Sequence, residues 1–255
     1  MPNNKTQSDA GLFLTGKNAI VTGATRGIGR AIALRLASAG ANVAITGRSE
    51  TSAREAAAAL EQVARAASGE TGVRVIGAAC DAGDSAAVAQ FFTFVDAQFG
   101  GLDILVNNAG VGTFRDTALL TIPEWNETIA TNLSGVFYAS REALARFATR
   151  GGGYIINVSS LAGKNPFAGG AAYNASKFGL NGFSEAMMLD HRGDNVKVSY
   201  IMPGSVDTEF GANRTGAEWK IASEDIADIV EMLLRMPPRT LVSRVEVRPS
   251  KPPKK

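Results

Sequence analysis

Tyr173 and Lys177 are the two residues whose types and spacing point most directly to chemistry. Four positions apart on a helix, they would share one face. An unperturbed phenol ionises near pH ~10, which is too high for ready proton exchange at neutral pH. One positive charge roughly 4 Å away is worth about 4 kcal/mol at an effective dielectric of about 20, or about three pKa units. The pair therefore predicts a tyrosine that exchanges a proton with a substrate, helped by an ammonium group.

The spacing alone is weak evidence, because a lysine follows a tyrosine at this distance by chance with odds of about one in fifteen. The other tyrosines, Tyr138, Tyr154 and Tyr200, have no lysine at that spacing. Other motifs must therefore decide whether the pair is functional.

Composition narrows the class of protein. The 255 residues carry 26 Lys and Arg against 24 Asp and Glu, a net charge of +2, which argues against nucleic acid or an anionic membrane as a partner. Cys80 is the only cysteine, so no disulfide can form within the chain, and with the lone His191 it makes no metal-ligand cluster. We therefore expect no metal and a cytoplasmic location, since no apolar run suits a signal or a membrane span. A flexible leader over residues 1–14 and a flexible basic tail over residues 249–255 should flank one domain.

A glycine-rich segment predicts a phosphate-binding loop. An apolar run at residues 19–22 reads as a buried strand, and the period then changes to that of an amphipathic helix that ends before Gly40. Residues 23–29 between them, Gly-Ala-Thr-Arg-Gly-Ile-Gly, let the backbone turn tightly and a diphosphate approach the helix N-terminus. The segment is not a Walker A loop, because Gly-Lys-Ser/Thr is missing, nor is it G-x-G-x-x-G.

Further markers follow the predicted strands. The strand at 104–106 runs into Asn-Asn-Ala-Gly at residues 107–110, and the strand at 154–158 ends in Ser159 and Ser160. Pro203 and Gly204 follow a strand over residues 196–202, and Asn132 interrupts the apolar stripe of a long helix over about 121–150. Alternation of strands and helices predicts a doubly wound parallel α/β sheet with right-handed crossovers.

Together these markers resemble the short-chain dehydrogenase/reductase family of the Tyr-x-x-x-Lys type, over roughly residues 16–247. The resemblance implies a single-domain Rossmann fold over residues 15–248, with a seven-stranded parallel sheet of order 3-2-1-4-5-6-7. It also implies an enzyme that moves a hydride between a nicotinamide and a carbonyl or secondary alcohol. In this family pattern Ser160, with Ser159 as the alternative, holds the carbonyl oxygen, and Tyr173 transfers the proton. Lys177 lowers the phenol pKa and binds the nicotinamide ribose, and Asn132 bends its helix and anchors a water on the proton path.

The resemblance also implies the cofactor contacts. A site for NAD typically has an acidic residue after the second strand, which binds the ribose hydroxyls. A site for the 2′-phosphate of NADP has a guanidinium there instead. Arg48 stands there and Arg26 lies in the glycine loop, so we expect NADP(H) in preference to NAD(H), unless both arginines are merely solvated. The predicted cofactor residues are Gly23, Thr25, Arg26, Gly27, Ile28, Gly29, Arg48, Ser49, Asp81, Ala82, Asn108, Ala109, Gly110, Tyr173, Lys177, Pro203, Gly204, Val206 and Thr208.

The substrate pocket reads as mostly apolar, which suggests a ketone, an aldehyde or a 3-oxoacyl-type substrate. Its predicted lining is Val111, Phe114, Leu161, Phe167, Met202 and a short lid over residues 210–221 anchored by Trp219. Arg115 or Lys164 could meet a carboxylate. The chain lacks the family's usual Asp-Gly-Gly ending, so a homodimer and a homotetramer both stay open.

Two other functions compete with this interpretation. One is a sensor that binds NADP(H) without turnover, although a sensor has no need of Asn132, Ser160, Tyr173 and Lys177 together. The other is a nucleotide-sugar epimerase or dehydratase, which would need differently spaced glycines and a larger C-terminal domain.

Overall fold

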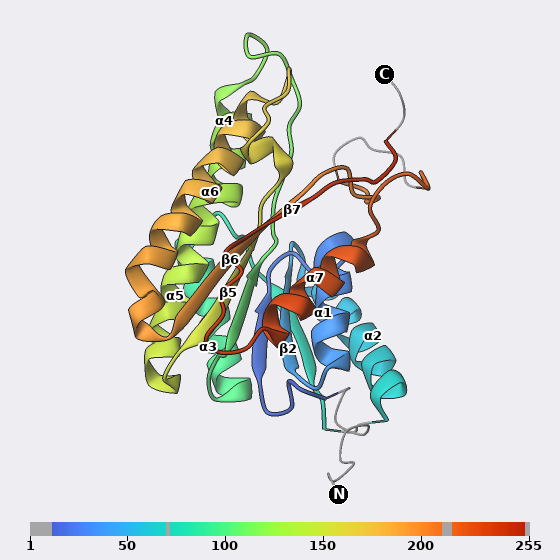
Figure 1. Cartoon of the computed structure of the whole chain (residues 1–255), viewed down its shortest axis with the longest axis vertical. Coiled ribbons are helices and arrows are strands. Elements are labelled where there is room, and N and C mark those ends of the chain that lie inside the picture. The colour runs from blue at the N-terminus through green and yellow to red at the C-terminus, as the bar shows by residue number, and fades with distance from the viewer. Residues whose placement is uncertain (1–11, 70–71, 211–215, 253–255) are drawn as a thin grey trace, which may run out of the picture.

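The computed structural model describes residues 12–69, 72–210 and 216–252. Within these residues seven parallel strands form one sheet of order β3-β2-β1-β4-β5-β6-β7, which confirms the predicted α/β Rossmann topology (Figure 1). The strands are β1 Asn18–Val21, β2 Asn42–Gly47, β3 Val75–Ala79, β4 Ile104–Asn107, β5 Gly153–Val158, β6 Val196–Pro203 and β7 Arg244–Val247.

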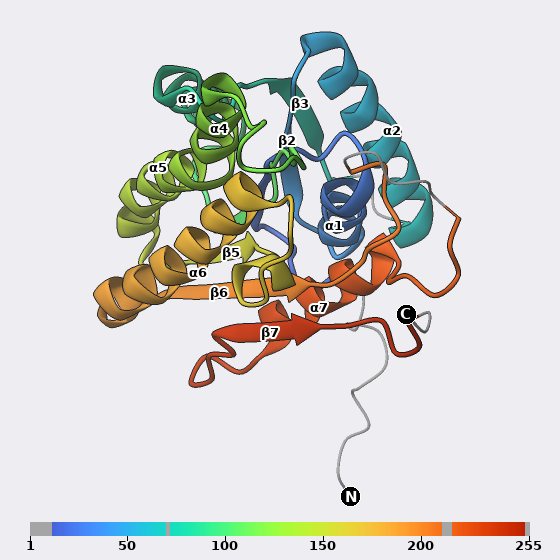
Figure 2. The same ribbon diagram turned by 90° about the horizontal axis from the view of Figure 1, so that it is seen from above.

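Helices cover both faces of the sheet (Figure 2). One face carries α1 Gly27–Ser38, α2 Glu50–Ser68 and α7 Ser223–Arg235, and the other carries α3 Ser85–Phe99, α4 Ile122–Ile129, α5 Gly135–Arg150 and α6 Ala171–His191. The central strands β1 and β4 are buried along their whole length because helices cover them on both sides. The edge strand β7 alternates exposed and half-buried residues, as its sequence predicts.

The strand order reverses between β1 and β4. From β1 the chain moves outward through β2 to β3 and then returns to place β4 against the other side of β1. In open α/β sheets such a reversal leaves a crevice at the carboxyl ends of the strands, and ligands bind there. The glycine loop after β1 and the Asn-Asn-Ala-Gly segment after β4 both lie at this edge.

The predicted long helix over 121–150 is interrupted. It begins as predicted, with Thr121 and Glu124 forming a capping box. A π-helical turn, Ala130–Ser134, then separates α4 from α5, and Asn132 lies in that turn with no exposed surface. A π-turn contains one more residue than an α-helical turn, so a polar side chain in it can bond to groups outside the helix. Such turns are frequent at functional sites.

The chain ends differ in part from expectation. Leu14 is buried in the core and Phe13 packs under the guanidinium of Arg235, so the domain begins earlier than residue 15. Residues 1–11 of the predicted leader, residues 211–215 of the predicted lid and residues 253–255 of the predicted tail lie outside the described residues. In the described parts, none of the helices has the length and apolar character needed to cross a membrane.

Candidate active site

Tyr173 and Lys177 share one face of α6, as their spacing predicts. The Lys177 Nζ lies 5.7 Å from the centre of the Tyr173 ring. The same Nζ donates a hydrogen bond of 2.9 Å to the main-chain oxygen of Val158, the last residue of β5. Lys177 is 5% exposed, and Tyr173 is half-buried. The strand end therefore fixes the ammonium beside the phenol.

The two serines after β5 have different surroundings. Ser159 is buried, and its hydroxyl donates to Asn181 Oδ1 at 2.5 Å. The Ser160 Oγ accepts the N–H of Ala162 at 3.1 Å and so caps a single 3₁₀ turn, Leu161–Gly163. The Ser160 hydroxyl is also hydrogen-bonded to the Tyr173 phenol, so it lies beside the group that would exchange a proton with a substrate. This geometry favours Ser160 over Ser159 as the serine that meets a carbonyl oxygen.

Burial shifts both titrating groups. It raises the pKa of the Tyr173 phenol above its ordinary value, and a hydrogen bond with Ser160 opposes that rise. It lowers the pKa of Lys177 to about 8, because the charged form loses water. The causes of the phenol shift are burial and Ser160, and the lowering of the phenol pKa by Lys177 stays a prediction. At neutral pH the phenol is a protonated acid and Lys177 is poised close to its titration.

Asn132 joins the π-turn to two other parts of the site. Its Oδ1 accepts the N–H of Val111 at 2.8 Å, and its Nδ2 donates to the Val111 oxygen at 2.8 Å. The same Nδ2 donates to Ser176 Oγ at 3.1 Å, next to Lys177 on α6. Both amide protons are thus used inside the protein. Of the side-chain groups, only the second lone pair of Oδ1 remains for a water on the proton path.

The N-terminus of α1 is open to an anion. Ser49, Asp84 and Thr121 cap α2, α3 and α4 with their side chains. Within the described chain, by contrast, α1 has no side-chain cap and no acidic residue in its first turn. No side chain thus competes for its first N–H groups, and the helix dipole favours negative charge there.

The glycine loop that borders the crevice has no room for side chains at several positions. A methyl group on Gly23, which has a φ of +63°, would lie 2.8 Å from the Ala109 Cα. One on Gly29 would lie 2.4 Å from the Asn108 Nδ2 and so block the packing of α1. One on Gly27 would meet Thr208 at 3.4 Å, so the loop after β6 approaches the glycine loop closely. The residues fit a dinucleotide, whose diphosphate needs this close approach to backbone.

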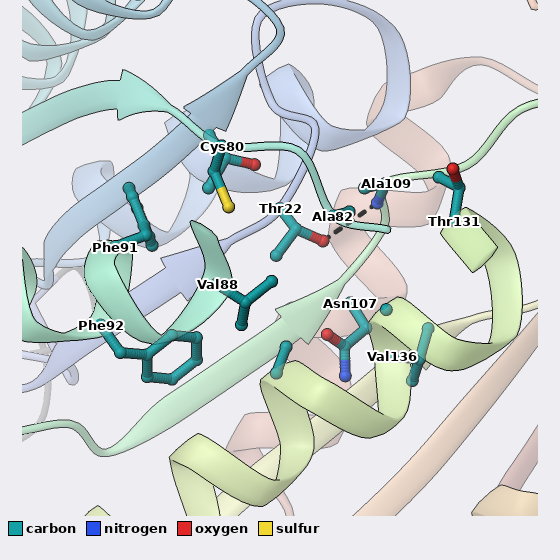
Figure 3. A pocket seen from close by; sticks show the side chains of 13 residues that line it. Thr22, Cys80, Ala82, Val88, Phe91, Phe92, Asn107, Ala109, Thr131 and Val136 are labelled. Atoms are coloured by element: carbon teal, nitrogen blue, oxygen red, sulfur yellow. Dashed lines mark hydrogen bonds between the residues drawn. The ribbon is translucent and has the colours of Figure 1, made fainter. Parts of the chain in front are cut away.

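Asn108 and Thr22 hold the two central strand ends together. The Asn108 Nδ2 donates to the oxygens of Thr22 and Gly23 at 3.0 and 2.9 Å. In return, Thr22 Oγ1 accepts the N–H groups of Asn108 and Ala109, both at 3.0 Å, and the bond to Ala109 is drawn in Figure 3. These bonds join the chain segments that follow β1 and β4.

A small cavity lies behind this junction, lined by Thr22, Cys80, Phe92, Asn107 and others (Figure 3). Its volume of about 10 Å³ leaves room for about one water molecule and none for a cofactor. Burial raises the pKa of the Cys80 thiol to about 11, so the thiol is neutral and behaves as a small apolar side chain, as expected.

The predicted adenosine contacts lie at the ends of β2 and β3. Arg48 is exposed directly after β2. Arg26 is not a simple solvated arginine, because its guanidinium pairs with Glu209 at 2.9 Å, from the segment after β6. Ser49 caps α2, and Asp81 accepts the N–H of Gly83 at 2.8 Å.

The remaining predicted cofactor residues follow the same carboxyl edge of the sheet. A methyl group on Gly47, at the end of β2, would meet Thr25, and one on Gly110 would meet the Asn132 amide. The Gly204 N–H donates to the Val247 oxygen at 2.8 Å, and Val206 bridges to Ile221. The others are Ile28 in the first turn of α1, Ala82 after β3 and Pro203 at the end of β6.

Asn181 is a site residue that the sequence interpretation missed. Besides accepting from Ser159, it donates through Nδ2 to the Gly163 oxygen at 3.0 Å. It thereby ties α6 to the 3₁₀ turn that begins beside Ser160. Its position four residues after Lys177, on the same helix face, was the only signal available.

Comparisons with known proteins agree with this geometry. The sequence model described as short chain dehydrogenase matches residues 17–219. A 3beta-hydroxysteroid dehydrogenase of Mediterraneibacter gnavus is 36% identical over 209 residues, which is 82% of this chain and 72% of that protein. A metagenomic short-chain oxidoreductase in complex with NADP is 40% identical with a TM-score of 0.80, covering 94% of this chain and 99% of its own. An alcohol dehydrogenase from the archaeon Thermococcus sibiricus, complexed with 5-hydroxy-NADP, is 30% identical with a TM-score of 0.84 and the same coverage.

The chain belongs to the short-chain dehydrogenase/reductase family. It is an NAD(P)-dependent oxidoreductase that acts on CH–OH and C=O groups, with a nicotinamide cofactor and a small-molecule substrate.

Proposed function

We propose that the protein is an NADP(H)-dependent reductase of ketones or aldehydes with an apolar body. The observation that carries the proposal is the meeting of Ser160, Tyr173 and Lys177 at the sheet edge where the N-terminus of α1 lies open. A protonated phenol hydrogen-bonded to a serine hydroxyl is suited to receive a carbonyl oxygen that gains negative charge.

Each residue has a separate task in this proposal. When bound, the nicotinamide exchanges a hydride with the substrate carbon. Ser160 donates its hydroxyl hydrogen to the carbonyl oxygen, and Tyr173 gives its proton to the same oxygen. Lys177, held by the Val158 carbonyl, places positive charge beside the phenol. Once Tyr173 has given up its proton, Lys177 passes a proton to the phenolate and is then reprotonated from water. Asn132 positions this machinery, because it ties α6 to Val111.

Tyr173→Phe tests the assignment against a sensor that binds cofactor without turnover. The variant should lose turnover while its Kd for the cofactor stays close to wild type, since only the hydroxyl is removed. Turnover at the wild-type rate on a confirmed substrate would overturn the role of Tyr173. If the wild-type protein binds NADPH and reduces no carbonyl in a broad panel, the sensor is the better interpretation.

The preference for NADP(H) rests on Arg48 and Arg26. Both are exposed at the end of the crevice where the adenosine of a dinucleotide would lie, and two similar structures are named as complexes with NADP or its 5-hydroxy form. Arg48→Ala should raise the Kd for NADPH by about tenfold and leave that for NADH nearly unchanged, because a charged hydrogen bond to phosphate is lost. Arg54→Ala, an exposed arginine on α2, is the matched control. An equal effect on both cofactors would refute the preference.

We also propose a homodimer or homotetramer located in the cytoplasm. Large apolar side chains are exposed along α4, α5 and α6: Ile122, Trp125, Phe137, Phe178 and Leu189. We expect these side chains to contribute to a subunit interface, because contiguous exposed apolar surface marks interaction sites. Light scattering coupled to size-exclusion chromatography measures the mass, and a monomer at micromolar concentration would contradict the oligomer. The location rests on the single cysteine, which suits a reducing compartment.

A further inference from the structure

Three phenylalanines from three separate segments surround the ring of the catalytic tyrosine. Phe114 follows β4, Phe167 precedes α6 and Phe210 follows β6. Their ring centres lie 5.6, 6.5 and 5.7 Å from the centre of the Tyr173 ring. Phe114 also lies 5.6 Å from Phe167 and 6.4 Å from Phe210. All of these distances fall in the range of favourable aromatic pairs. We call Phe114, Phe167 and Phe210 the aromatic cluster.

The backbone fixes two members of the cluster side by side. Arg115 forms a parallel bridge with Gly170, which joins the segment of Phe114 to the loop of Phe167. The Phe167 oxygen accepts the Asn174 Nδ2 at 2.9 Å, so the loop is tied to the first turn of α6. The rings are therefore held beside the phenol before any substrate arrives.

Glycines make the close approach of the rings possible. A methyl group on Gly112 would lie 2.7 Å from the Phe210 ring and 2.8 Å from the Phe114 ring. A methyl group on Gly170 would lie 2.7 Å from the Phe167 ring. Larger residues at these two positions would push the cluster apart.

Part of the aromatic surface of the cluster is exposed, so a ligand could pack against it. Phe114 and Phe167 remain 43% and 45% exposed although they touch the catalytic tyrosine. Exposed aromatic surface costs free energy, and a planar apolar group that covered it would recover that cost.

The nearby cations do not favour an anionic substrate. Arg115 pairs with Glu124 at 2.8 Å, and Lys164 pairs with Glu246 at 2.5 Å. A substrate carboxylate would have to displace one of these partners. Each of the two cations predicted to meet a carboxylate thus already has an anionic partner, which weakens its attraction for a second anion.

We infer that the substrate carries an uncharged aryl ring, which packs against Phe114 and Phe167 while its carbonyl oxygen meets Ser160 and Tyr173. This inference rests on the proposed function and adds to it a substrate class. The ring faces of the cluster discriminate an aryl group from a saturated ring of the same size, because only the aryl group forms aromatic pairs.

Two ketones of equal carbon skeleton provide the test. Benzylacetone and the ketone in which cyclohexyl replaces its phenyl ring have the same unconjugated carbonyl, so their intrinsic reactivities match. The wild-type protein should show a kcat/KM ratio that favours the phenyl ketone by about twofold to tenfold, the value of one aromatic pair. Phe114→Leu and Phe167→Leu should each bring the ratio toward one. Phe178→Leu replaces an equally exposed phenylalanine outside the cluster and should leave the ratio unchanged.

The ratio is independent of the fraction of folded protein, so a partly unfolded variant still gives an answer. A wild-type ratio near one, or equal ratios in all variants, would overturn the inference and leave the proposed function standing. If no carbonyl in a broad panel is reduced, the proposed function fails instead. The Kd values of the two corresponding alcohols, measured with saturating NADP⁺, then decide the inference: a preference for the phenyl alcohol supports it, and equal affinities overturn it.

Discussion

Replacing Lys177 by methionine should change how the stability of the protein depends on pH. Lys177 is buried, and burial lowers its pKa from 10.5 to about 8. Below about pH 8 the lysine is charged in both the folded and the unfolded state, and the folded state bears the full cost of desolvation. Between about pH 8 and about 10.5 the folded state releases the proton while the unfolded state keeps it. Because the unfolded state then binds more protons, the wild-type protein gains stability as pH rises.

The magnitude follows from the two pKa values. Integrating the proton difference from about pH 7.5 to about pH 9.5 gives a gain of about 2 kcal/mol in the free energy of unfolding. Methionine has no proton to release, so Lys177→Met should lack this gain. The variant also leaves the Val158 oxygen without its lysine partner, which costs about 1–3 kcal/mol at every pH. That cost is constant and cancels when the two pH values are compared.

Urea unfolding at both pH values measures the difference, at one protein concentration because oligomers complicate the equilibrium. Wild type should gain about 2 kcal/mol relative to Lys177→Met between the two conditions. Lys164→Met is the control. The Lys164 side chain is half exposed, so this variant removes a lysine that is not buried. A difference between wild type and Lys177→Met that does not change with pH would refute the claim that burial shifts this lysine.

Three further outcomes are expected. The kcat for carbonyl reduction should fall as pH rises through about 8, because Lys177 loses the proton that the relay needs; a flat rate to about pH 9.5 would contradict this. Glu209→Gln should lower the Kd for NADPH by up to about fivefold, since the exposed pair with Arg26 is worth at most about 1 kcal/mol. Titration monitored by cofactor fluorescence measures this, and a weaker affinity would show that Glu209 helps binding. Asn181→Ala should reduce kcat about tenfold with the cofactor Kd unchanged, because the turn beside Ser160 loses its anchor; an unchanged kcat would show that the anchor is dispensable.

Local patterns in the sequence predict the fold and most of the edge where the site lies. The spacing of hydrophobic residues distinguishes strands from helices. The family resemblance predicts the order of the strands, and the sheet confirms that order. The glycine loop, the Asn-Asn-Ala-Gly segment and the Tyr173–Lys177 spacing could all be read from neighbours in the chain. Ser159 and Ser160 could not be told apart by residue type.

The tertiary structure decides what depends on distance between remote segments and on burial. Asn181 accepts the hydroxyl of Ser159, whereas Ser160 is hydrogen-bonded to Tyr173, and neither contact could be read from the sequence. Glu209 pairs with Arg26, and no local pattern records that contact.

Burial raises the pKa of the Tyr173 phenol, and this loss of water cannot be read from the sequence, where only the lysine four residues away is visible. The aromatic cluster likewise exists only because three loops converge on one helix turn. Sequence thus determined which chemical groups reach the crevice, since side-chain period and turn residues are local properties. Folding determined how each group is solvated and paired, because both depend on atoms that the chain brings together from far away.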